Sequence, residues 1–245
     1  MAILKTNLND IQKPYLNDIQ KTDLNNEYKL IQPWSVPILR TKLPKSVYDA
    51  LYEISENILR NPDSESYGDK LAGQIETEKS INTALLESYD ISKYFKNILT
   101  QFILECKAQM MPDAIEKVKN NTYDVKLQSM WIVSQKSGEY NPVHHHTNCQ
   151  ISGVMYLKLP SMLPSPKRDH NDGSINFLND GSRDLELSNP YYQPCIQIGE
   201  LYIFGSQQKH AVYPFRSSEL TAERRSISFN ASFNDMPENY DITKI

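Results

Sequence analysis

Short apolar runs and alternating polar and apolar residues fill the second half of the chain. Residues 123–135, 151–157 and 201–204 follow this pattern, and glycines flank the last run. Such runs between turn residues are typical of β-strands. We therefore predict a mostly β second half, in which a further short strand begins at His210.

The segment from Arg224 to Asn230 alternates strictly. Successive side chains of a strand point to opposite faces, so Ile227 and Phe229 would pack on a core. The polar face would carry Arg224, Ser226, Ser228 and Asn230. A guanidinium on such a face can bind a carboxylate bidentately, although an exposed edge strand shows the same alternation.

Helical spacing of apolar residues marks two segments of the first half. Apolar side chains recur every three or four residues from Pro44 to about Leu59, and again from about Ser92 to Lys119 with an interruption near Pro112. A first strand is predicted over residues 33–39. We expect the helices to pack on the outside of a sheet, and we assign them no chemistry.

A short duplication, Leu-Asn-Asp-Ile-Gln-Lys, occurs at residues 8–13 and again at 16–21. Two copies are too few for a repeat architecture, which needs about three units or more. We assign residues 1–32 to an N-terminal arm and residues 33–245 to a single domain. One β-rich domain commonly reaches this size.

Composition and charge narrow the class of protein. The net charge is −4 and no block of basic residues is present, which disfavours a nucleic-acid partner. Cys106, Cys149 and Cys195 show no disulfide or zinc spacing and favour a reducing compartment. Because no signal-peptide or membrane-spanning pattern is visible, we expect no membrane partner and a cytoplasmic location. A homodimer is left open.

Chemistry concentrates at three consecutive histidines, His144 to His146, out of five in the chain. In an extended segment, side chains two apart point the same way, so His144 and His146 can converge while His145 turns away. Neutral imidazoles suit Fe, Zn, Cu and Ni, whereas a solvated loop or a hydrogen-bonded turn is the alternative. A rival pair, His170 and Asp172, stands in a loop rich in proline and serine, and we predict Asp172 to be a turn residue.

A longer motif contains the favoured histidines. Its residues are Asn141, Pro142, His144, His146 and Asn148, followed by Ser152, Gly153, Val154, Tyr156 and Leu157. Together with residues 173–177, the strand before His210 and the segment that begins at Arg224, it resembles the 2-oxoglutarate- and Fe(II)-dependent oxygenases. The most similar group is a putative oxygenase family common in marine bacteria and their phages. The resemblance runs from about Trp131 to Asn230.

The resemblance implies a fold and a site. The fold would be mostly β, a double-stranded β-helix of the jelly-roll, cupin-like type with supporting α-helices from the N-terminal half. The iron ligands would be His144, His146 and His210. The distal carboxylate of 2-oxoglutarate would be bound by Arg224, with Tyr156 and Ser226 as further donors.

His146 departs from the commoner pattern, in which that position holds Asp or Glu. A carboxylate lowers the charge of an iron centre, and a neutral imidazole does not. Three outcomes stay open: a three-histidine set, a two-histidine site with water as the third ligand, and a site with altered chemistry. Because the most similar family also has His-x-His, we expect the three-histidine set.

The implied function is a 2-oxoglutarate- and Fe(II)-dependent dioxygenase that hydroxylates an unknown small-molecule or protein substrate. It would release succinate and CO2, with ascorbate as an optional reductant in vitro, and a phage-encoded copy would act in the host cytoplasm. One alternative is a cupin-like metal-binding protein without 2-oxoglutarate chemistry, but such a protein needs no carboxylate anchor like Arg224. The other alternative is a catalytically inactive structural or virion-associated jelly-roll protein.

Overall fold

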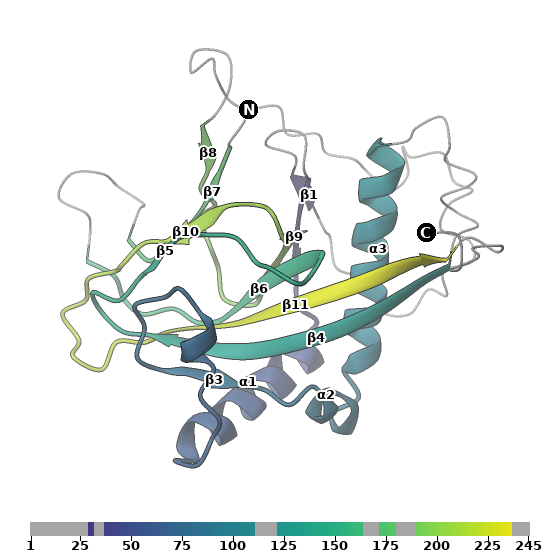
Figure 1. Ribbon diagram of the computed structural model, residues 1–245. Helices are drawn as coiled ribbons and strands as arrows, with labels where there is room; N and C mark the ends of the chain where they lie inside the picture. The colour runs from purple at the N-terminus through teal and green to yellow at the C-terminus, as the bar shows by residue number, and fades with distance from the viewer. Residues whose placement is uncertain (1–28, 32–36, 111–121, 164–171, 180–189, 237–245) are drawn as a thin grey trace.

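Two antiparallel β-sheets and the helices beside them make up the part of the chain that the computed structural model describes, which is residues 29–31, 37–110, 122–163, 172–179 and 190–236 (Figure 1). The N-terminal duplication and His170 lie outside these residues. The helices are α1 (Lys45–Arg60), α2 (Ala84–Ser88) and α3 (Ser92–Met110), with a short 3-10 turn at Gly68–Lys70. The strands are β1 (Lys29–Ile31), β2 (Ile38–Lys42), β3 (Glu78–Ser80), β4 (Thr122–Gln135), β5 (Asn141–His144), β6 (Ile151–Lys158), β7 (Ile175–Leu178), β8 (Tyr191–Tyr192), β9 (Glu200–Gly205), β10 (His210–Val212) and β11 (Arg224–Met236).

The strands of the described residues pair in two sheets. The major sheet has the order β1-β2-β9-β6-β11-β4-β3, and the minor sheet has the order β5-β10-β7-β8. Most neighbouring strands are not consecutive in sequence, and the long strands β11 and β4 run antiparallel side by side. This arrangement is the mostly β, jelly-roll type of fold that was predicted, with helices from the first half of the chain beside it (Figure 1).

Each face of the major sheet has its own core. On one face, Ile132, Ile227 and Phe229 pack with apolar residues of α1 and α3. On the other face, Tyr156 and Phe204 pack with apolar residues of the minor sheet. The strict alternation of β11 is therefore confirmed, because its apolar residues face the helices and its polar residues face the space between the sheets. That space holds the site.

Most predicted elements are present within about two residues of their expected bounds. Helix α1 matches its prediction, and α3 begins at Ser92 as expected and is described as far as Met110. Strand β2 begins at Ile38, so it overlaps the predicted strand only at its end, and residues 32–36 lie outside the description. None of the described helices has both the length and the hydropathy of a membrane span.

Gly153 in the middle of β6 has a packing reason. A Cβ atom at this position would lie 2.3 Å from a ring carbon of Phe229, the residue opposite it on β11. Glycine inside a strand often marks such a close approach. The ring of Phe229 can therefore lie across the sheet and pack on Phe95 of α3, with 5.8 Å between ring centroids.

Candidate functional site

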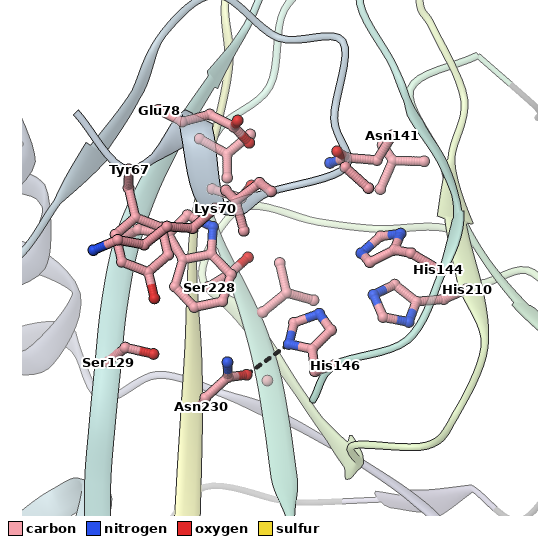
Figure 2. A pocket seen from close by; sticks show the side chains of 18 of the residues that line it. Tyr67, Lys70, Glu78, Ser129, Asn141, His144, His146, His210, Ser228 and Asn230 are labelled. Carbon is pink, nitrogen blue, oxygen red and sulfur yellow. Dashed lines mark hydrogen bonds between the residues drawn. The ribbon is translucent and has the colours of Figure 1, made fainter. Parts of the chain in front are cut away.

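A cavity of about 470 Å³ lies between the two sheets. Strands β4 and β11 form one wall, and β5 and β10 of the minor sheet form the opposite wall. The segment from Tyr67 to Ala72 and the edge strand β3 close a third side. Figure 2 shows three histidines grouped on one side of this cavity and polar residues of β4 and β11 facing them.

The sheet register brings the three predicted ligands together. His144 ends β5 and His210 begins β10, and their Cα atoms are partners in the antiparallel pair. His146 follows two residues after His144, and His145 between them is exposed. One ring nitrogen from each of His144, His146 and His210 lies within 4.8 Å of the others. Within the described residues, this is the one group of three or more such side chains with the spacing of a metal site.

Each of the three rings is oriented by a hydrogen bond at Nδ1. The Nδ1 atom of His144 lies 2.8 Å from the backbone oxygen of Pro142, and that of His210 lies 2.8 Å from the backbone oxygen of Gln208. For His146 the acceptor is the Asn230 side-chain oxygen, at 2.6 Å (Figure 2). Because these oxygens accept a hydrogen bond from a protonated Nδ1, each neutral ring keeps a lone pair on Nε2, the form that binds a metal.

The electrostatics of the group favour neutral rings. Burial, together with a smaller effect of the nearby His144, lowers the pKa of His146 to about 4. Burial also lowers the pKa of His144, and it lowers that of His210 well below its ordinary value, an effect that the other rings strengthen. Three neutral imidazoles at neutral pH suit a transition-metal cation, because no proton has to be displaced from them.

Arg224 lies at the start of β11 on the cavity face and is only 1% exposed. Its Nη1 donates a hydrogen bond to Gln135 at 3.1 Å, but its Nε has no partner among the described residues. The guanidinium lies over the Tyr156 ring, 5.0 Å from the centroid. The Tyr156 hydroxyl is fully buried and also forms no hydrogen bond there. Burial raises the pKa of Tyr156 to about 12, so the hydroxyl stays a neutral donor.

Two donors without partners beside a buried charge fit the binding of an anion. A buried guanidinium is costly unless it is paired, and no carboxylate pairs with Arg224 in the part of the chain described. Ser226, two residues further along β11, lines the same cavity. Arg224, Tyr156 and Ser226 were all predicted as cosubstrate donors, and they lie together beside one cavity wall.

The next residue, Arg225, has the opposite environment. It points to the helix side, where it pairs with Glu223 at 2.8 Å and with Glu56 of α1 at 2.6 Å. This pairing holds the pKa of Glu223 down to about 2 despite its burial. Arg225 therefore fastens α1 to the sheet, and the two adjacent arginines have different roles because strand neighbours face opposite sides.

Asp172 of the rival pair does not join the histidines. It lies in a turn, as predicted, and its carboxylate accepts a hydrogen bond from Arg216 at 3.0 Å. Cys149 also stays outside the group, with its sulfur 3.8 Å from the Ser152 hydroxyl.

Two parts of the site had no signal in the sequence. One is the hydrogen bond from His146 to Asn230, which joins residues 84 positions apart. The other is the third wall of the cavity, which includes Tyr67, Lys70 and Glu78. Strand β3 has three polar or charged residues and no alternation, so only its pairing with β4 reveals it.

A comparison of the sequence with models of protein families agrees with the fold, the histidine group and the buried arginine. Residues 129–230 match the model of the family described as putative 2OG-Fe(II) oxygenase. The match covers less than half of the chain, and over these residues the chain is similar to that family. The match covers all the predicted site residues, from His144 to Ser226, but not β3 or the segment before it.

Two solved structures are similar to this chain at low sequence identity. A 2OG-Fe(II) oxygenase family oxidoreductase from Burkholderia pseudomallei is 13% identical with a TM-score of 0.47, and the alignment covers 82% of this chain and 88% of that one. A prolyl-4-hydroxylase from Pseudomonas putida is 16% identical with a TM-score of 0.43, covering 81% and 92%. A comparison with curated proteins finds no match.

Members of the 2OG-Fe(II) oxygenase family are oxidoreductases that use Fe(II) and 2-oxoglutarate. The donor set of this chain suits both groups. Three neutral imidazoles could hold the iron. The unpaired donors of Arg224 and Tyr156 suit the distal carboxylate of a dicarboxylic acid.

Proposed function

We propose that this chain is a 2-oxoglutarate- and Fe(II)-dependent dioxygenase that hydroxylates its substrate and releases succinate and CO2. The observation that carries the proposal is one cavity bordered by two complementary features. One is a group of three neutral histidines with free Nε2 atoms, and the other is a buried arginine that has no carboxylate partner among the described residues. Neither feature is needed for a stable jelly roll.

His144, His146 and His210 would bind the iron through Nε2. Their Nδ1 hydrogen bonds hold the rings in place before the metal arrives, so little side-chain entropy remains to be lost on binding. With three neutral ligands the site would keep the full double charge of the iron. Acidic cosubstrate groups would then be attracted more strongly than at a site with a carboxylate ligand.

Arg224 would bind the distal carboxylate of 2-oxoglutarate through the Nε edge that is now unpaired, with Tyr156 and Ser226 as further donors. Arg224 and Tyr156 are buried, and surroundings of low polarity strengthen a charge-assisted hydrogen bond. When bound, iron and 2-oxoglutarate supply the oxidising chemistry, in which O2 and the keto acid yield succinate, CO2 and one oxygen atom for the substrate. The chain supplies position and exclusion of water.

An assay of 2-oxoglutarate turnover tests this proposal. Purified protein that is supplied with Fe(II) and 2-oxoglutarate in air should form succinate slowly, even without its substrate. Loss of a charge-assisted bidentate contact costs roughly 2 to 4 kcal/mol, so Arg224→Ala should require about 30- to 1000-fold more 2-oxoglutarate. Arg216→Ala is the matched control, because Arg216 is half-exposed and pairs with Asp172 outside the site.

The alternatives give different results. A cupin-like metal protein without 2-oxoglutarate chemistry would bind metal but form no succinate, and its metal affinity would be the same in the Arg224→Ala variant. An inactive structural protein would show neither metal binding nor succinate formation. Either result would overturn the proposed function.

A further inference from the structure

Glu78 is a buried acid on the cavity wall outside the matched family region. It begins β3 and lies opposite Val133 of β4, so its side chain shares the inner face of the sheet with Val133 and Trp131. Only 2% of the residue is exposed. Figure 2 shows Glu78 at the end of the pocket away from Asn230 and His146.

Neither carboxyl oxygen of Glu78 has a hydrogen-bond partner among the described residues. Lys79 points the other way and donates to the backbone oxygen of Ser64 at 2.8 Å. Lys70 borders the cavity, but its ammonium group lies over the Tyr67 ring, 4.8 Å from the centroid, and forms no ion pair with Glu78. A carboxyl group in these surroundings contributes nothing to the fold that an apolar residue would not.

Two glycines lie beside this carboxyl group. A Cβ atom at Gly68 or Gly73 would lie 3.4 Å from one of its oxygens. At Gly73 the same atom would also lie 2.2 Å from the side-chain oxygen of Asn141. The Glu78 carboxyl group and the Asn141 side-chain oxygen, two acceptor groups of the cavity wall, therefore lie close together beside Gly73. A ligand that binds to them must offer hydrogen-bond donors.

An aromatic wall leads from this acceptor region to the histidines. Tyr67 and Trp131 are stacked, with 4.9 Å between centroids, and the Trp131 ring lies 5.8 Å from that of His146. Leu71 and Val133 extend the apolar surface. Such a wall suits a chain of methylene groups, with a polar head at Glu78 and a carbon atom near the metal ligands.

We propose that Glu78 determines specificity by binding the protonated nitrogen group, an amine or a guanidinium, of an alkyl-chain substrate. This proposal rests on the proposed oxygenase function, since it assigns the substrate class of the same cavity. Two kinds of molecule carry such a group. One is a free amine or amino acid, and the other is a peptide with a lysine or arginine side chain. Both present the same head group on the same methylene chain.

Ligand-observed NMR with the full-length, metal-free protein tests the proposal without any turnover. The probes are L-lysine against L-norleucine and L-arginine against L-citrulline, pairs in which the neutral member has a similar chain. The same two cationic residues in blocked tripeptides form the second arm. We expect at least one cationic probe to bind ten-fold or more tightly than its neutral partner, and the better arm identifies the source.

Glu78→Gln should remove this preference, with at least a tenfold loss of cation affinity. Glu78→Ala is a second variant, which should show the same loss and which excludes binding of a ligand by the new glutamine amide. Glu76→Gln is the matched control, since Glu76 is an exposed acid two residues earlier that does not line the cavity. Equal binding of charged and neutral probes, equal binding to Glu78→Gln, or binding of none of the probes to the wild type would overturn the assignment of Glu78. A parallel titration of the wild-type protein with Fe(II) and 2-oxoglutarate reports separately on the proposed function.

Discussion

Replacement of Glu78 by glutamine should stabilise the protein at neutral and alkaline pH. Burial raises the pKa of Glu78 to about 7 from an ordinary 4.5, and the charge of Glu139 adds to the rise. Between pH 4.5 and pH 7, the Glu78 carboxyl group therefore carries a proton in the folded state, whereas it has lost that proton in the unfolded chain. Stability then falls as the pH rises from 4.5 to 7 and levels off above 7, where both states are ionised.

The size of this effect follows from the same pKa. At 1.36 kcal/mol for each pH unit, the full cost of ionising Glu78 is roughly 3 kcal/mol, of which about 2.5 kcal/mol develops between pH 5 and pH 8. Urea unfolding of metal-free wild type and Glu78→Gln at these two pH values measures it. The stability advantage of the variant should grow by about 2 to 3 kcal/mol, since other titrating groups act equally on both proteins. An advantage that does not change with pH would refute the reasoning.

Three further results are expected. His210→Ala should abolish the binding of a divalent transition metal measured by calorimetry, whereas Asp172→Ala should keep it, and the opposite ranking would mean that the site was assigned to the wrong residues. Asn230→Ala should weaken metal affinity about 10- to 100-fold by freeing the ring that it orients, and an unchanged affinity would exclude that role. Gly153→Ala should cost about 1 to 3 kcal/mol in urea unfolding, because the new methyl group would lie 2.3 Å from the ring of Phe229, and a neutral change would show that this contact relaxes freely.

Local patterns in the sequence were enough to predict most strands near the site. The alternation from Arg224 to Asn230 has a period of two, and that period alone decides which side chains face the cavity. The separation of His144 and His146 by one residue places both rings on the same side for the same reason. A resemblance across several segments was needed to add His210, because no local pattern links it to the other two.

Long-range pairing explains what the sequence did not predict. Strand β3 is three residues long and has no apolar alternation, so nothing in it indicates that Glu78 would reach the cavity. The contact between His146 and Asn230 depends on the register of β11 against β6, where Asn230 lies opposite Ser152. Register is a property of the assembled sheet, and a single strand does not determine it.

An anaerobic titration tests the central claim most directly. Protein loaded with Fe(II) is titrated with 2-oxoglutarate, and the visible absorption band of a keto acid chelated to iron is recorded for wild type, His210→Ala and Arg224→Ala. We expect a saturable band with one equivalent of iron in the wild type, no band in His210→Ala, and a band in Arg224→Ala that requires about 30- to 1000-fold more 2-oxoglutarate. A wild-type protein that binds iron but gives no band, or a band that is unchanged in Arg224→Ala, would contradict the account.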